Sequence, residues 1–209
     1  MDLKAFFKMN YGLYIISSKD GEGAAGCVVN TLTQVTAEPP KVMLAIHKDN
    51  RTTQAILNSG VFAATVLTQD APMELIGRFG FQSSREVDKL QGYEVKEDKN
   101  GLPWLTRQMA ARFSCRVLDR MDAGTHYLFL AQVEEAETLS QDEPMTYSYY
   151  HAVKNGRTPP KASSYQPEES PKARGWRCKI CGYVLDAEEL PPDFVCPICK
   201  KGAEFFEKL

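Results

Sequence analysis

Two Cys-x-x-Cys pairs near the C-terminus place the strongest constraint on how this chain can fold. The pairs are Cys178 with Cys181 and Cys196 with Cys199, and fourteen residues separate them. Four thiolates supplied in this way can surround one metal ion tetrahedrally, and both iron and zinc accept that geometry. The sequence therefore predicts a small metal-stabilised domain whose ligands are these four cysteines.

A segment with the composition of a linker precedes the cysteines. Residues 155–175 contain four prolines, three serines and almost no apolar side chains. Such a composition favours an extended, flexible connection. We therefore expect a larger domain over residues 1–154, a flexible linker over 155–175 and the small metal domain over 176–209.

Residues 1–154 alternate between apolar runs rich in β-branched side chains and short turns. We expect a mainly β fold, an antiparallel barrel that is closed or nearly closed, with few helices. Helices are predicted to begin near Asn50 and near Asp70, with Pro72 in the first turn of the second helix. The predicted strands are 11–18, 25–31, 41–47, 61–67, 110–118 and 126–134.

The hexapeptide 21–26, Gly-Glu-Gly-Ala-Ala-Gly, matches a dinucleotide-binding pattern but has the wrong surroundings for it. It lies between two predicted strands, whereas that motif needs a helix immediately after its glycines. We interpret it as a hairpin turn.

Charge and hydropathy exclude several other functions. The net charge is −2, and no cationic cluster is present, which argues against nucleic acid as a partner. No apolar leader and no run of about 18 apolar residues occur, so we expect a cytoplasmic protein without a membrane span. Cys27 and Cys115 lie in apolar, strand-like sequence and are expected to be reduced core thiols.

The residues around the four cysteines resemble rubredoxin. The similarity lies in Trp176, in the Cys-Gly-Tyr sequence at 181–183, in Pro-Pro-Asp-Phe at 191–194 and in Cys-Pro at 196–197. The spacer is short, as in rubrerythrins, and Lys200 stands where a glycine usually follows the fourth cysteine. The resemblance implies one iron in an FeS₄ centre that passes single electrons. A structural zinc ribbon is the alternative.

Three segments of the larger domain resemble the flavin reductase-like family of FMN-binding split β-barrels. They are residues 29–44, residues 47–53 and residues 124–129. The resemblance implies that FMN is bound and that NAD(P)H is the transient hydride donor. Independently of the family, a monophosphate favours helix N-terminal amides, hydroxyls and a cation, which Asn50, Arg51, Thr52 and Thr53 offer at a predicted helix start.

The candidate flavin-site residues follow from these segments. Asn30, Thr31 and Thr33 are expected at the pyrimidine edge of the flavin. The segment 78–89 either closes over the cofactor, with Ser83 and Lys89 as candidate contacts, or is for most of its length a solvated loop. His126 is the candidate catalytic residue, beside the flavin, where it would steer nicotinamide or a proton. The phosphate is assigned to the group His47, Lys48, Asn50, Arg51, Thr52 and Thr53.

The order of the two parts resembles the high-molecular-weight rubredoxin family. That resemblance implies that NAD(P)H reduces FMN and that FMN reduces the iron. The iron then passes electrons to a flavodiiron protein that reduces nitric oxide or dioxygen. The resemblance to the split-barrel family also implies a homodimer. A free flavin reductase that releases reduced FMN, with a zinc ribbon at its C-terminus, is the competing interpretation.

Overall fold

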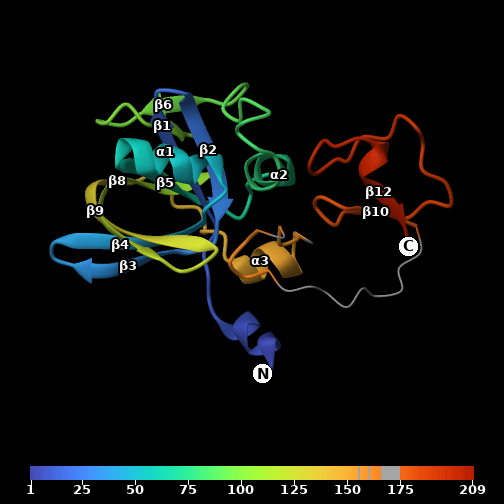
Figure 1. Cartoon of the computed structure of the whole chain (residues 1–209), viewed down its shortest axis with the longest axis horizontal. Coiled ribbons are helices and arrows are strands. Elements are labelled where there is room, and N and C mark those ends of the chain that lie inside the picture. The colour runs from blue at the N-terminus through green and yellow to red at the C-terminus, as the bar shows by residue number, and fades with distance from the viewer. Residues whose placement is uncertain (155, 160, 166–174) are drawn as a thin grey trace.

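The computed structural model describes residues 1–154, 156–159, 161–165 and 175–209. Figure 1 shows a strongly curled sheet flanked by short helices, with the small C-terminal domain lying beside helix α2. The expected fold class, mainly β with few helices and a separate four-cysteine domain, is confirmed. Within the described residues, no helix combines the length and the apolar character needed to cross a bilayer.

One antiparallel sheet of seven strands forms the larger domain. Its spatial order is β2-β1-β5-β8-β9-β4-β3, so the two edge strands are neighbours in the sequence. The sheet is strongly curled and its two edge strands do not pair with each other, so the barrel is open between β2 and β3. The strands are β1 (Tyr14–Asp20), β2 (Gly23–Val29), β3 (Leu32–Ala37), β4 (Pro40–His47), β5 (Val61–Leu67), β8 (Met109–Asp122) and β9 (His126–Thr138).

The glycine-rich hexapeptide does belong to a hairpin, but most of it is strand. Only Gly21 and Glu22 form the turn, and β2 starts at Gly23. Gly26 pairs with Ser17 in the ladder, and a Cβ at Gly26 would lie 2.8 Å from the Phe79 ring. The last glycine of the motif is therefore required by the packing of helix α2 against the sheet.

The helix predicted to begin near Asn50 is confirmed, and residues next to each of its ends explain where it starts and stops. Helix α1 (Arg51–Ser59) is capped by Asn50, whose side-chain oxygen accepts a hydrogen bond from the Thr52 N–H at 3.0 Å. It ends at Gly60, which takes the left-handed conformation with φ 72°.

The second helix starts later than predicted, because Pro72 occupies its N-cap position. Helix α2 (Met73–Phe81) therefore includes residues 78–81, which were expected to form part of a covering loop. In the larger domain the strand and helix patterns missed the edge strand β3 and four short elements, η1 (Leu3–Lys8), β6 (Val95–Glu97), β7 (Pro103–Leu105) and α3 (Tyr147–Ala152).

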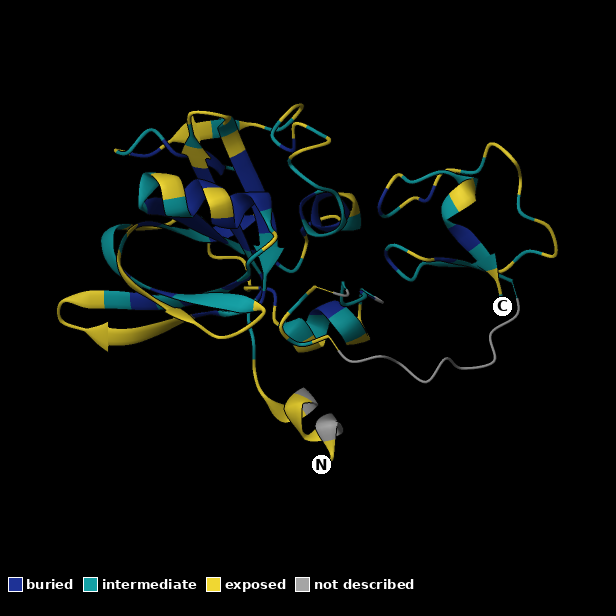
Figure 2. Ribbon diagram, in the orientation of Figure 1, coloured by how far each residue is buried: buried dark blue, intermediate teal, exposed yellow. Residues whose placement is uncertain are grey.

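Two large apolar cores and one small cluster, of Val61, Ala63, Leu102 and Trp104, hold the larger domain. Figure 2 shows the two large cores as the dark interior of the sheet and of its contact with the helices. The first fills the barrel and includes both Cys27 and Cys115, as expected for core thiols. Burial raises the pKa of both thiols, that of Cys115 to about 12. The second core packs α2 against β1 and includes Tyr150.

The C-terminal domain is small and built around its cysteines. It contains β10 (Trp176–Cys178), β11 (Val184–Leu185), η2 (Ala203–Phe205) and β12 (Phe206–Lys208), with the sheet order β11-β10-β12. Among its described residues, the buried cluster consists of the four cysteines and Phe206. So few buried apolar side chains cannot by themselves hold a domain of this size folded.

The described part of the expected linker packs against the larger domain. The Arg157 N–H donates to the Tyr150 hydroxyl at 3.1 Å, and the Lys161 ammonium pairs with Asp49 at 2.9 Å. Residues 155, 160 and 166–174 of the expected linker lie outside the described residues. Residues 156–159 and 161–165 are thus part of the folded domain, which differs from the flexible connection predicted from composition.

Candidate functional site

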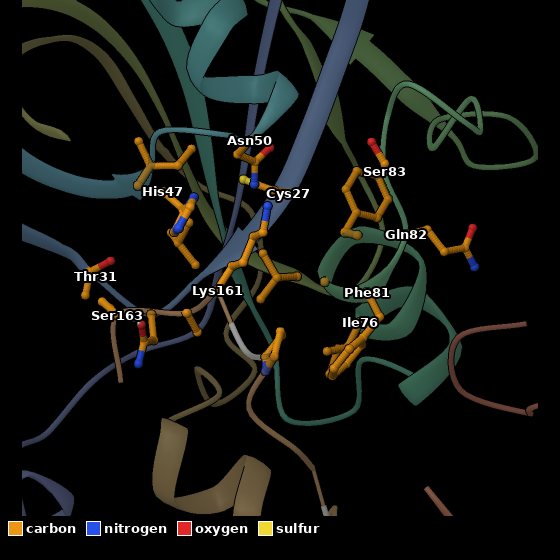
Figure 3. Close-up of a pocket in the computed structure, with 18 of the residues that line it drawn as sticks. Cys27, Thr31, His47, Asn50, Ile76, Phe81, Gln82, Ser83, Lys161 and Ser163 are labelled. Atoms are coloured by element: carbon orange, nitrogen blue, oxygen red, sulfur yellow. Dashed lines mark hydrogen bonds between the residues drawn. The ribbon is translucent and has the colours of Figure 1, made fainter. Parts of the chain in front are cut away.

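A cavity of about 440 Å³ opens where the split edge of the barrel meets helix α2. This volume falls in the range of small-molecule sites. Figure 3 shows Thr31 and His47 on one side of the cavity, Ile76, Phe81 and Gln82 on the other, and Asn50 with Cys27 between them. The residues come from β2, β4, α2 and the loop before α1, so segments distant in the sequence jointly form the walls.

Most of the residues singled out from the sequence line this cavity. Thr33 is exposed on β3, Lys48 pairs with Asp122 on the surface, and Thr52 and Thr53 are fully buried behind the cavity wall. These four do not line the cavity as the structure describes it. The eight that do are Asn30, Thr31, His47, Asn50, Arg51, Ser83, Lys89 and His126.

The start of helix α1, predicted to bind a phosphate, already holds an ion pair. The guanidinium of Arg51 donates to both carboxylate oxygens of Asp20, at 2.6 and 3.2 Å, and lies 3.4 Å from Glu22. Hydrogen bonding by Arg51 holds the pKa of Asp20 below its usual value. The charge of Arg51 is therefore largely balanced inside the protein, which weakens the argument that it neutralises a ligand.

Sequence reasoning missed the cavity residues contributed by the expected linker. Lys161 and Ser163 line the cavity, and Ser163 donates to the Asn30 side-chain oxygen at 3.3 Å. The Asn30 side-chain amide donates in turn to the Ser164 hydroxyl at 2.9 Å. No signal within 155–175 separates these residues from an ordinary polar linker, because only the tertiary fold brings them to Asn30.

Lys89 is a buried cation in the cavity wall. Its side chain donates to the backbone carbonyls of Gly26 at 2.8 Å and Phe79 at 2.9 Å, and the residue is 5% exposed. Burial lowers the pKa of Lys89 to about 8. The ammonium thus links β2 to the end of α2 at the back of the cavity.

Replacing Lys89 with Met is expected to change both stability and its pH dependence. At neutral pH the variant removes the ammonium donor from the Phe79 carbonyl and leaves the Gly26 carbonyl with the Ser84 hydroxyl, at a cost of about 1–3 kcal/mol in the free energy of unfolding. Between pH 8 and 10.5 the unfolded chain holds one proton more than the folded wild type at Lys89. Its contribution to the free energy of unfolding therefore rises with pH in that window, by up to about 3 kcal/mol.

Urea denaturation of both proteins at pH 7.5 and at pH 10 measures this contribution. Titrating groups that do not interact with Lys89 cancel in the difference between wild type and Lys89→Met, whereas Cys27, whose pKa Lys89 lowers, does interact with it. That difference should increase from the lower to the higher pH, and a difference independent of pH would contradict the assignment.

Two histidines meet at the cavity edge. The rings of His47 and His126 are 5.1 Å apart in an edge-to-face arrangement, and the Thr125 hydroxyl lies 2.9 Å from Nδ1 of His126. Burial, with a smaller effect of His47, lowers the pKa of His126. At neutral pH the His126 imidazole is therefore uncharged and can donate or accept one hydrogen bond to a ligand.

The four predicted ligand cysteines converge in the C-terminal domain. Their sulfurs all lie within 4.8 Å of one another, with Sγ of Cys178 3.5 Å from that of Cys199 and Sγ of Cys181 3.4 Å from that of Cys196. A tetrahedron with metal–sulfur bonds of 2.3 Å has edges of about 3.8 Å. The donor set and its size fit one iron or zinc ion.

The four thiols lie too close together to ionise independently. Hydrogen bonds between the thiols lower the pKa of Cys178 and Cys196 and raise the pKa of Cys181 and Cys199, because a second buried negative charge is unfavourable beside the first. A metal ion removes this conflict by accepting all four as thiolates. The loops that carry the cysteines turn through left-handed residues, Gly182 at φ 76° and Lys200 at φ 60°.

The cavity and the cysteine cluster share a boundary. Lys179 and Ile180, which stand between the first two cysteines, line the cavity. Phe81 at the end of α2 lines the same cavity and packs against the cysteine cluster. Within the described residues, a ligand in the cavity would therefore lie next to a loop that holds the metal.

Comparisons with known proteins identify both parts of the chain. Residues 6–155 match the flavin reductase like domain, and residues 176–207 match the rubrerythrin, rubredoxin-like domain. The chain belongs to the flavin reductase-like family. Its two-part organisation is also that of a high molecular weight rubredoxin from Moorella thermoacetica, which is 39% identical over the full length of both chains. The family predicted from the sequence motifs is thus confirmed.

Other relatives share the larger domain. A ferric-chelate reductase (NAD(P)H) from Archaeoglobus fulgidus is 41% identical over 79% of this chain and 98% of its own length. The NADH:FAD oxidoreductase SgcE6 of Streptomyces globisporus has the same fold, with a TM-score of 0.63 at 22% identity, over 70% of this chain and 86% of that chain. The chain is therefore an oxidoreductase that joins a flavin reductase domain to a rubredoxin-like iron-binding domain.

Proposed function

We propose that this protein passes electrons from NAD(P)H to an outer acceptor through FMN in the cavity and one iron bound by the four cysteines. A bound flavin can take two electrons together as a hydride and give them up singly, which suits a one-electron iron centre. The main support for the proposal is the boundary that the cavity shares with the cysteine cluster, where Lys179 and Ile180 of the cysteine loop line the cavity.

The residues proposed to hold FMN are those of the predicted set that line the cavity. Asn30 and Thr31 would meet the pyrimidine edge, where Asn30 already has Ser163 and Ser164 as partners. Ser83, with Asn50 at the α1 start, would meet the phosphate. His126 would stand at the nicotinamide side as a neutral hydrogen-bonding group.

The proposed acceptor is a flavodiiron protein that reduces nitric oxide or dioxygen. The full-length similarity to a high molecular weight rubredoxin supports it, together with the fusion of the two domains. We further propose a homodimer in the cytoplasm, with functional units at residues 1–154 and 176–209 joined by 155–175.

Anaerobic rapid mixing with NADH, and separately with NADPH, tests the proposal. The purified protein should show flavin and ferric-thiolate absorption, and the flavin band should bleach before the iron band. A flavin that bleaches while the iron stays ferric would support a free flavin reductase instead. A colourless protein with zinc by elemental analysis would support the zinc-ribbon alternative.

Reduction of ferric chelates is a second candidate activity. Its support is the 41% identity to the Archaeoglobus ferric-chelate reductase over nearly the whole of that relative. Ferric-EDTA reduction by NADH should then proceed at a rate that does not depend on the four-cysteine centre.

A further inference from the structure

Helix α2 carries a glycine at the point where the C-terminal domain touches it. A Cβ added at Gly77 would lie 2.0 Å from the backbone oxygen of Ile198, between the third and fourth cysteines. No side chain fits there without moving one domain. Gly77 therefore sets how closely the second cysteine loop approaches the helix.

The contacts around Gly77 all involve the cysteine-bearing edge of the small domain. The Gln82 side-chain amide donates to the Cys199 carbonyl at 3.1 Å, and Phe81 packs against the cysteine cluster. Two ion pairs flank them, Lys200 with Glu74 at 3.5 Å and Lys201 with Glu86 at 3.1 Å. Figure 1 shows the domain facing α2 across this contact.

The first cysteine loop faces the same way. Ile180 lines the cavity, and a Cβ at Gly182 would lie 3.3 Å from Cγ of Arg157. Both loops that carry the sulfurs thus lie against the larger domain, and each of the four cysteines is at most 3% exposed.

We propose that α2 is a reversible docking surface for the C-terminal domain of the same chain. Docking there loads the iron centre from the cavity, and release uncovers the same cysteine-bearing edge for an outer acceptor protein. This inference rests on the proposed function. Loading of the iron and delivery of electrons are separated because they take place in different positions of the small domain. It makes loading and delivery mutually exclusive positions of one domain.

The nature of the contact supports reversibility. All four side chains of the two ion pairs are at least 30% exposed, so solvent screens them and they add little to the association. Around Gly77 the described residues add one hydrogen bond, from Gln82 to Cys199, and the packing of Phe81 and Ile198. Because the two domains share one chain, even a weak contact forms often.

The variant Gly77→Ala tests the docking surface. Alanine favours a helix more than glycine does, so α2 remains folded while its Cβ displaces Ile198. In rapid mixing with NADH we expect flavin bleaching at the wild-type rate and iron bleaching slowed by about tenfold or more, in proportion to the lost docked population. Gly21→Ala, which meets no atom within 4 Å, is the matched control and should behave as wild type.

The outcomes separate this inference from the proposed function. If iron in the wild type never bleaches, the proposed relay fails. If the wild type transfers electrons and Gly77→Ala does so equally fast, the relay holds and the docking surface is refuted.

A covalent lock tests the release step. A carbodiimide condenses the Lys201 amine with the Glu86 carboxylate into an amide, with the loss of one water taken up by the reagent. The linked full-length protein should still load its iron from NADH but should fail to reduce oxidised cytochrome c, used as a protein acceptor. The double variant Lys200→Arg and Lys201→Arg keeps both charges but cannot be linked, and should deliver normally after the same treatment.

Normal delivery by the linked protein would overturn the release step. Electrons would then leave the docked domain through its outer side, where Val195 is 55% exposed beside Cys196. Peptide mass spectrometry of the linked fraction confirms which amide has formed.

Discussion

Removing the metal is expected to unfold residues 176–209 and to leave the larger domain folded. The buried cluster of the small domain contains, among the described residues, four cysteines and Phe206. A domain of this size normally needs a metal or disulfides, and structural metal ions supply about 10–16 kcal/mol to comparable small sites. The buried apolar clusters of the larger domain include no described residue of 176–209.

Limited proteolysis of the metal-free and metal-loaded protein measures this effect. Trypsin sites such as Arg177 and Lys201 should become accessible only when the metal is absent, while the thermal transition of the barrel shifts little. Reconstitution with zinc is the control, because it should restore protection without restoring the ferric colour. Protease resistance of residues 176–209 in the metal-free protein would contradict the expected dependence.

Local chemistry accounts for the features that were predicted correctly. Asn50 and Gly60 delimit α1 because a side-chain acceptor and a left-handed glycine act within one turn of the helix. The spacing of the two cysteine pairs likewise specifies a four-sulfur cluster, since each pair is a local loop. Such features depend on few residues and little on the rest of the fold.

The features that were not predicted depend on long-range contacts. Arg51 is predicted to contact a phosphate and does line the cavity, but the sequence does not reveal that Asp20, 31 residues earlier, pairs with it in the fold. Lys161 is predicted to lie in a flexible linker, although in the fold it pairs with Asp49, which lies 112 residues earlier in the sequence. No local pattern distinguishes an ion-pair partner from a ligand contact, because both roles require the same charged side chain.

Gly77 illustrates the same limit in a different way. A glycine inside a helix usually lowers the stability of the helix, and the residues next to Gly77 in the sequence give no reason for a glycine at this position. The reason lies 121 positions later, where the Ile198 carbonyl occupies the space of its missing side chain. A residue that is unfavourable locally is thus explained by packing between domains.

The variant Cys178→Ser is expected to separate the two half-reactions of the proposed relay. It removes one of four thiolates, and with it the tetrahedral sulfur set on which both the metal and the fold of residues 176–209 depend. Delivery of electrons to an outer acceptor should fall by more than about 100-fold. Substituting a residue that only hydrogen-bonds to a metal ligand already lowers metal affinity or activity by about 10- to 100-fold. Reduction of the flavin by NADH should stay within about twofold of wild type, because the cavity wall formed by β2, β4 and α2 belongs to the other domain.

Cys115→Ala provides the control for a lost thiol. Cys115 is fully buried in the barrel core and far from the cysteine cluster in the sequence. Replacing it should lower the stability of the barrel modestly and leave both flavin reduction and electron delivery unchanged. One anaerobic experiment measures both steps. NADH is added first and bleaching of the flavin is followed, and the protein is then mixed with oxidised cytochrome c to measure delivery of electrons. Lys179 and Ile180 of the small domain line the cavity, so loss of both steps in Cys178→Ser would mean that the cysteine loop shapes the flavin site itself rather than receiving electrons from it.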